Sequence, residues 1–320
     1  MILRNVRFLI LFVALLSITS FSCTDSDPSP QLTQEQINTE KLLSDIKYLS
    51  SDELEGRKTG TEGNRLAQKF ISDRFTTIGL QPLNNSYEQT FEHVNSRSGE
   101  EFKSAVNLIG MIEGASGNDQ FIVITAHYDH LGIRGEDIYN GADDNASGTA
   151  GLLAVAEYFS NQKPENNLLF IAFDAEEQGL AGAYHFVETP LIPQDQITVN
   201  VNMDMISTNF ENELYAVGTY HYPFLKPLIE EATADASVNV LFGYDSNAWS
   251  QDWTLASDHG PFHLQGIPFI YFGVEDHEHY HQPTDIYENI NEEFFIQSVE
   301  TIIDVIVNFD RNLDSIANQN

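Results

Sequence analysis

Residues that could bind a metal ion or move a proton follow three strongly apolar runs of the sequence. The run F-I-V-I-T-A leads into His127, and Asp129 comes two residues later. L-L-F-I-A-F is followed by D-A-E-E, which contains Glu176 and Glu177, and I-T-V-N-V-N-M is followed by Asp204. Acidic side chains directly after buried strands are unfavourable unless their charge is compensated. This placement predicts a site where the charged groups meet.

Two further segments carry the same residue types. N-G-A-D-D-N-A-S-G contains Asp143 and Asp144, and Y-H-Q-P-T-D places His281 in a Pro-containing loop after I-P-F-I-Y-F-G. In an extended backbone His127 and Asp129 point to the same face, so Asp129 can accept a hydrogen bond from one ring nitrogen while the other binds metal. Taken singly, each segment is equally typical of a structural histidine, a turn or a helix cap.

The groups together suit a metal better than a nucleophile. Two imidazoles with three or more carboxylates form a nitrogen and oxygen set suited to zinc, with cobalt or manganese as substitutes. The one cysteine, Cys23, lies far from these segments, and the sequence has no G-x-S-x-G turn of the kind that serine hydrolases use. A metal-dependent reaction is therefore the favoured chemistry.

Alternating strand-like and helix-like runs must position these residues. The alternation of these runs predicts an α/β fold, in one domain with a central, mostly parallel mixed β-sheet and helices on both faces. Open sheets of this kind place their sites at the carboxyl ends of strands, where the candidate groups lie. We expect strands over 104–112, 121–127, 168–173, 197–203, 213–218, 238–243 and 267–273, and helices over 40–49, 63–80, 147–160, 179–187, 222–234 and 292–312.

The N-terminus reads as an export signal. Arg4 and Arg7 precede an apolar run, Phe8 to Ile18, that is too short to span a bilayer. T-S-F-S-C then resembles a bacterial lipoprotein processing site, which would make Cys23 the lipid-bearing first residue. We expect a signal peptide over 1–22, a flexible tether over 23–39 and a catalytic domain over 40–320. The protein would be exported and anchored by lipid in the bacterial cell envelope, facing the periplasm or the exterior.

The charge of the chain restricts its partners. Its 15 basic and 48 acidic residues give a formal charge of −33, and loss of the signal with Arg4 and Arg7 would make it −35. We expect no nucleic-acid ligand, because the acidic chain would repel the phosphates. Anionic membrane surfaces would be repelled too, so attachment would depend on the lipid and not on a basic patch.

The set of motifs resembles a known family, the co-catalytic di-zinc aminopeptidases related to secreted bacterial leucyl aminopeptidases, metallopeptidase family 28. The similarity runs from about Leu43 to the end, and it includes L-S-S-D-E-L-E-G-R near the start and S-D-H-G-P-F at Ser257 to Phe262. It implies a zinc-dependent aminopeptidase that acts on peptides with a free N-terminus. Hydrolysis would use a hydroxide that bridges two zinc ions.

The resemblance also implies roles for individual residues. One zinc ion would be held by His127 and Asp204 and the other by Glu177 and His281, with Asp144 bridging both. Glu176 would be the general base, Tyr280 would stabilise the oxyanion, and Asp129 would orient His127. The peptide bond between Asp144 and Asn145 is expected to be cis.

Several alternatives remain open at this stage. Some family members have an arginine where this chain has Ala256, so any substrate contact of that arginine is in doubt here. His277 and His279 are expected to be solvated loop histidines, and the aromatic loop Tyr244 to Trp253 could line a side-chain pocket or pack in the core. The rival functions are a dipeptidase or carboxypeptidase of the same fold, a glutaminyl cyclase, and a non-catalytic binding ectodomain.

Overall fold

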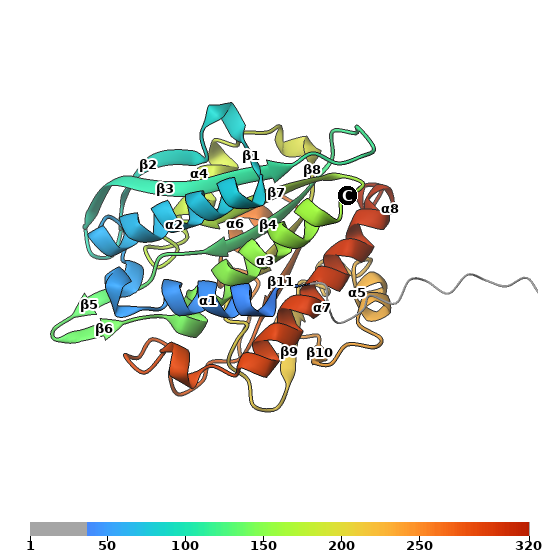
Figure 1. Cartoon of the computed structure of the whole chain (residues 1–320). Coiled ribbons are helices and arrows are strands. Elements are labelled where there is room, and N and C mark those ends of the chain that lie inside the picture. The colour runs from blue at the N-terminus through green and yellow to red at the C-terminus, as the bar shows by residue number, and fades with distance from the viewer. Residues whose placement is uncertain (1–36, 320) are drawn as a thin grey trace, which may run out of the picture. The chain divides into compact units, whose positions relative to one another are not determined.

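A nine-stranded mixed β-sheet runs through residues 37–319, the part of the chain that the computed structural model describes (Figure 1). The strand order is β1 (Gln81–Pro82), β3 (Glu101–Ile112), β7 (Asn167–Phe173), β4 (Phe121–His127), β8 (Ile197–Met203), β11 (Phe269–Gly273), β9 (Glu213–Val217) and β10 (Asn239–Leu241), with β2 (Glu88–Val94) paired to β3. Strands β7, β4, β8 and β11 are parallel neighbours, and β3 and β9 flank them in the antiparallel sense.

The central strands are buried along their whole length. Every residue of β4, β7, β8 and β11 is buried. Parallel sheets are covered on both faces, and their strands therefore read as continuous apolar runs. This is why the apolar runs of the sequence located these strands to within two residues. The predicted α/β fold class with a central, mostly parallel sheet is confirmed.

Helices cover both faces of the sheet. Figure 1 shows four of them over the near face: α1 (Thr39–Leu49), α2 (Glu62–Ile78), α3 (Gly148–Asn161) and α7 (Glu292–Arg311). The two helices α4 (Ala181–Glu188) and α6 (His259–Leu264) lie behind it and share a second apolar cluster with the sheet. Two short helices, α5 (Lys226–Ala232) and α8 (Leu313–Ala317), pack against α7.

Some elements differ from the expectation. The helix expected over 222–234 is shorter and comprises only α5. A turn from Tyr222 to Leu225 precedes it, and Pro227 lies in its first turn. Proline is favoured in the first turn because its missing N–H has no partner there in any case. The hairpin of β5 (Gly132–Arg134) and β6 (Asp137–Tyr139) and the six-residue α6 were not expected, since both are too short to show a periodic pattern.

The predicted signal peptide 1–22, Cys23 and most of the tether lie outside the described residues. Within 37–319, none of the helices is both long and apolar enough to cross a bilayer.

Candidate active site

The carboxyl ends of the central strands bring the predicted site residues to one edge of the sheet. His127 is the last residue of β4, and Asp204 follows β8 directly. Glu177 lies in the turn after β7, and His281 lies in the loop after β11. Asp144 comes from the irregular turn Ala142–Ser147 that leads into α3, and its peptide bond to Asn145 is cis.

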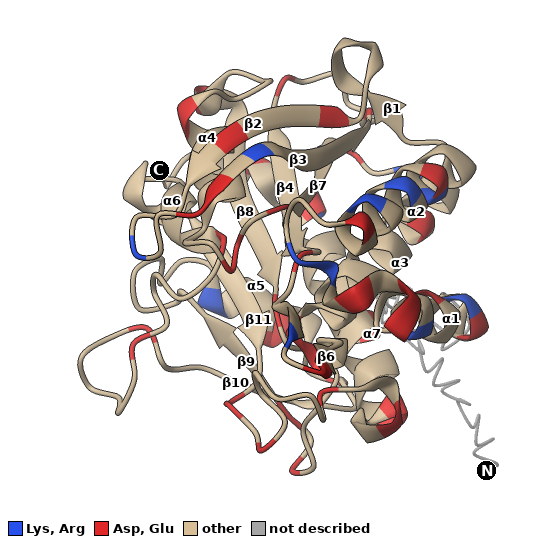
Figure 2. Ribbon diagram, turned by 90° about the vertical axis from the view of Figure 1, so that its left-hand side faces the viewer, with Lys and Arg blue, Asp and Glu red and all other residues tan. Residues whose placement is uncertain are grey.

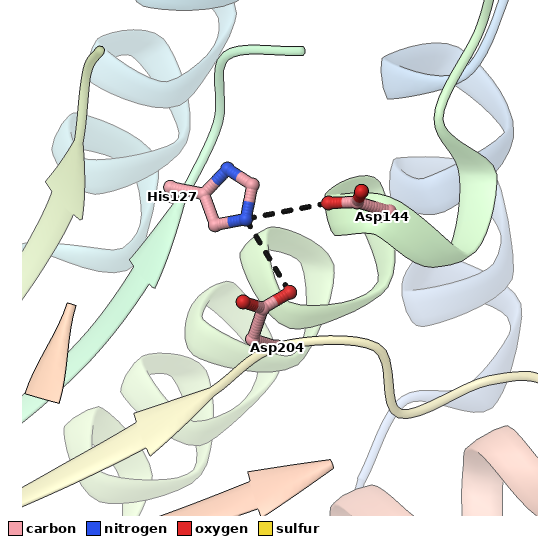
Figure 3. Close-up of side chains that lie close together, drawn as sticks. All are labelled: His127, Asp144 and Asp204. Carbon is pink, nitrogen blue, oxygen red and sulfur yellow. Dashed lines mark hydrogen bonds and ion pairs between the residues drawn. The ribbon is translucent and has the colours of Figure 1, made fainter. Parts of the chain in front are cut away.

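One group of side chains surrounds the imidazole of His127. The Nε2 atom of His127 lies 3.3 Å from Asp204 Oδ1 and 3.4 Å from Asp144 Oδ1 (Figure 3). All three side chains are nearly or fully buried, and their nearest atoms could share one metal ion.

A second group lies on the other side of Asp144. The Nε2 atom of His281 is 3.0 Å from Asp144 Oδ2 and 3.4 Å from Glu177 Oε1. Asp144 therefore turns one carboxylate oxygen toward each group. The structure brings all five predicted ligands together, with Asp144 in the middle.

His130 is a member of the second group that sequence reasoning missed. Its Nδ1 atom lies 2.9 Å from Glu177 Oε1 and 3.7 Å from Asp144 Oδ2, and its side chain is fully buried. Its ring centroid is 5.9 Å from that of His281, whose side chain is 37% exposed. The residue stands in the motif A-H-Y-D-H-L-G, but it is three positions beyond the end of β4, where strand periodicity no longer predicts its direction.

The residues fit a metal pair. Glu177 Oε1 and His130 Nδ1 are buried without a well-aligned hydrogen bond, although they lie 2.9 Å apart. Buried polar atoms normally have a partner, and a cation would supply one here. Three imidazoles and three carboxylates around two positions also match the ligand types that zinc takes in proteins.

A backbone N–H and a side-chain hydroxyl both donate hydrogen bonds to Asp129, which lies behind these groups. Its Oδ1 accepts from the N–H of Glu176 at 3.0 Å, and its Oδ2 accepts from the hydroxyl of Thr59 at 3.3 Å. His127 Nδ1 is 3.7 Å from the Asp129 carboxylate and 3.1 Å from its backbone carbonyl oxygen. The closer partner of the ring is thus the carbonyl, and the carboxylate also orients the turn that carries Glu176 and Glu177.

Asp143, the residue before Asp144, contacts the loop that follows β11 through His277. Asp143 accepts hydrogen bonds from Ser207 through Oδ1, and its Oδ2 lies 2.9 Å from Nε2 of His277. The N–H groups of Asp143 and Asp144 both donate to the carboxylate of Asp285. The expectation of a solvated His277 is therefore wrong, because its side chain is only 15% exposed and is paired with a buried carboxylate.

The carboxylates around His281 favour the positively charged form of its imidazole. Burial lowers the pKa of His281, but hydrogen bonds with Asp144 and Glu177 outweigh it and raise the pKa to about 10. Burial would raise the pKa of Glu177, and contacts with His130 and His281 instead hold it below its usual range. An arriving divalent cation would take the place of these protons, as metal ligands must be deprotonated.

The predicted proton-moving groups lie among the same carboxylates. Burial raises the pKa of Glu176 well above its usual range, with His127 lowering it and Glu177 raising it further. Burial also raises the pKa of the Tyr280 phenol, helped by the charge of Asp144, so its hydroxyl keeps its proton and can donate it in a hydrogen bond. The rings of Tyr280 and His281 stack with centroids 4.0 Å apart.

The segment that precedes α6 approaches the site from the other face of the sheet. Both carboxylate oxygens of Asp258 are buried without a hydrogen-bond partner, and burial raises its pKa. Ala256, two residues before Asp258, is exposed. The aromatic loop is part of the core at its two ends, where Tyr244 and Trp253 are buried and stack at 4.0 Å, whereas Trp249 is 44% exposed.

A peptidase family and an aminopeptidase resemble this chain in sequence. The model of "Peptidase family M28" matches residues 107–306, which is more than half of the chain and contains every predicted ligand. Aminopeptidase YwaD of Bacillus subtilis (strain 168) is 31% identical over 215 residues, which cover 62% of this chain. The match covers 44% of YwaD, so the chain spans less than half of that relative's length.

Solved structures of two activities share the fold. A leucine aminopeptidase precursor from Bacteroides thetaiotaomicron VPI-5482 superposes with a TM-score of 0.69 at 17% identity, covering 87% of this chain and 99% of that one. A glutaminyl cyclase from Porphyromonas gingivalis superposes with a TM-score of 0.69 at 18% identity, covering 88% and 99%. At such identities the likeness shows the fold alone.

Proposed function

Because the chain belongs to peptidase family M28, we propose that it is a zinc-dependent aminopeptidase that removes the N-terminal residue of peptides. One observation carries the proposal beyond the family. Asp144 Oδ1 lies 3.4 Å from His127 Nε2, whereas Asp144 Oδ2 lies 3.0 Å from His281 Nε2. A carboxylate with one oxygen toward each of two ligand groups suits two ions that share a bridging ligand.

His127 and Asp204 would hold one zinc ion, Glu177 and His281 the other, and Asp144 would bridge them. His130, close to Glu177, would complete the second group or orient it. A zinc pair in such a site lowers the pKa of water and polarises a carbonyl oxygen. Side chains of the protein would transfer the proton and stabilise the developing negative charge.

Glu176 is the group that would move the proton. Burial raises its pKa above that of an exposed glutamate, so its carboxylate is a stronger base than an exposed one. It would take a proton from the attacking water and later return it to the leaving amine. Tyr280, with its hydroxyl still protonated, would donate a hydrogen bond to the oxygen on which negative charge develops.

The acidic surroundings would also select the substrate. A free α-amine is positively charged near neutral pH, and the carboxylates around the site offer it acceptors. N-acetylation removes that charge. We therefore infer a preference for peptides with an unblocked N-terminus.

A substrate panel tests the proposal. One peptide would be offered free, N-acetylated and C-terminally amidated, with and without a chelator, and the products would be identified by mass. We expect loss of the N-terminal residue from the free and amidated forms, little reaction of the acetylated form, and none after metal removal. Release of C-terminal residues, or equal cleavage of the acetylated peptide, would point instead to a carboxypeptidase or dipeptidase.

The glutaminyl cyclase is the second candidate function, because proteins of that activity share the fold over 99% of their length. A peptide with N-terminal glutamine separates the two. An aminopeptidase releases free glutamine, whereas a cyclase releases ammonia and leaves the peptide intact with a closed N-terminal ring. We expect free glutamine, since a complete second ligand group is present here.

For its location, we propose export by a signal over residues 1–22 and anchoring by lipid on Cys23. The support is the sequence pattern of Arg4, Arg7, the short apolar run and the lone cysteine.

A further inference from the structure

The positively charged side chain of Arg57 lies close to the proposed metal site. The side chain of Arg57 is fully buried, and its guanidinium donates to four backbone carbonyl oxygens. These belong to Tyr128, at 2.8 Å, Asn140, at 2.6 Å, Gly141, at 2.9 Å, and Leu49. The planar guanidinium has five donors in a fixed arrangement, so it can join several chain segments at once.

The four carbonyls come from three segments, two of which carry proposed ligands. Tyr128 stands between His127 and Asp129 at the end of β4. Asn140 and Gly141 lead directly into the turn that presents Asp144. The third segment is the end of α1, at Leu49. One side chain therefore joins the backbone next to His127 to the backbone next to Asp144.

The backbone before Arg57 has an unusual conformation that directs this side chain into the interior. Glu55, Gly56 and Arg57 all have positive φ angles, of 50°, 66° and 50°. A Cβ atom on Gly56 would lie 2.2 Å from the carbonyl oxygen of Tyr139, so only glycine fits against the β5–β6 hairpin. The amide of Asn64 also donates to the carbonyl oxygen of Arg57 at 3.1 Å. Left-handed residues in succession persist only where surrounding contacts hold them.

The charge of Arg57 acts on the same site. Burial lowers its pKa to about 10, and the nearby carboxylates of Asp285, Asp144, Asp129 and Glu177 work in the opposite direction. The group therefore remains positive at neutral pH. It offsets part of the buried negative charge, but it would also repel an arriving zinc ion.

We propose that Arg57 is a positioning residue, which holds the backbone beside His127 and beside Asp144 in the metal-binding arrangement before metal arrives. This inference rests on the metal site proposed above. The charge of Arg57 and its hydrogen bonds are expected to affect zinc affinity in opposite directions. Loss of its charge alone would strengthen zinc binding, whereas loss of its hydrogen bonds would weaken it.

Zinc affinity measured by competition with a chelator decides between these effects. We expect Arg57→Lys and Arg57→Met both to weaken zinc binding by about 10- to 100-fold, the range found when groups that orient metal ligands are removed. Lysine keeps the charge but cannot reproduce the four bonds. The absorption spectrum of the cobalt-loaded protein should change in both variants, since it reports ligand geometry.

Arg74 provides the matched control. It is also a buried arginine, but it pairs with Asp45 and Glu157 on helices α1 and α3, and within residues 37–319 it makes no hydrogen bond or ion pair with the site loops. Arg74→Lys should lower thermal stability and leave the zinc affinity and the cobalt spectrum unchanged. Unchanged or tighter zinc binding in Arg57→Met, or equal losses in the Arg57 and Arg74 variants, would overturn the proposal.

A measurement on the unaltered protein covers the case in which the Arg57 variants do not fold. Hydrogen exchange of the metal-free protein should show residues 127–131 and 140–144 already protected, with little further protection on adding zinc. Exchange at the rate of an unfolded chain until zinc is added would contradict the inference. If the unaltered protein binds no zinc at all, the proposed function fails, and that outcome is distinct from the failure of Arg57 alone.

Discussion

Glu176 and Glu177 are adjacent in the sequence but are proposed to do different work. Glu177 lies within 3.4 Å of both His130 and His281, where it would bind metal. Glu176 would transfer protons. Its backbone N–H is held by Asp129, which fixes the turn that separates the two side chains.

Replacing each glutamate should therefore give a different loss. Glu176→Ala should keep its zinc and its substrate affinity, while turnover falls by about 10²- to 10⁴-fold, because only the proton transfer is removed. Glu177→Ala should lose zinc and thermal stability, since an uncompensated positive charge would remain. Metal analysis beside single-turnover kinetics would test both. Zinc loss in Glu176→Ala with retention in Glu177→Ala would mean that the roles are reversed.

At the scale of elements, helix α7 carries a partly buried carboxyl group, that of Asp304, whose ionisation destabilises the folded state. Burial, together with the charge of Glu300 one turn earlier, raises the pKa of Asp304 from 3.8 to about 6. The folded state therefore binds this proton more tightly than the unfolded state. The contribution is most favourable below about pH 4 and is lost as the pH rises through about 6.

Asp304→Asn should remove this pH dependence. We expect Tm to rise by about 1–3 °C at pH 8 and to stay unchanged at pH 4. Thermal unfolding at the two pH values measures this, with Asp119→Asn, on an exposed loop, as the control. An equal shift at both pH values would show that ionisation is not the cause.

The elements that the sequence predicted well are those with a strong apolar signal. Strands β4 and β8 match the expected residues because every side chain in them is buried. Helix α7 does so too, since an apolar stripe runs along its whole length. His127, Glu177 and Asp204 could be found because each lies at or just after the end of such a strand, whereas Asp144 and His281 lie in loops and were assigned through the family resemblance.

The rest of the site has no comparable signal in the sequence. The partners of Arg57 are backbone carbonyl oxygens, which no residue type reveals. His277 and Asp143 lie 134 positions apart and meet only through the fold. His130 follows the end of its strand, where a turn decides its direction. Contacts of these kinds depend on tertiary structure.

At the scale of the whole molecule, negative charge predominates. Figure 2 shows acidic segments over helices and loops, with basic ones most evident on α1 and α2. A chain with a net charge of −33 should have little affinity for nucleic acid or for anionic lipid. Attachment to a membrane would then require the proposed lipid.

Cys23→Ser tests that attachment in the full chain expressed in a bacterial host. The variant should keep its aminopeptidase activity but move from the membrane fraction to the soluble fraction, because a lipid cannot be added to serine in this position. Fractionation with activity measured in each fraction would show the change. An unchanged distribution would contradict the lipid anchor and leave the catalytic proposal intact.

The most direct test of the central claim is the number of zinc ions bound per chain, measured by equilibrium dialysis of the metal-free protein, with N-terminal residue release assayed in the same samples. Two ions per chain are predicted, with no activity before zinc is added. Asp144→Ala should lose affinity at both positions, since Asp144 contributes an oxygen to each group. Saturation below two ions, or full activity in the metal-free protein, would contradict a two-zinc aminopeptidase.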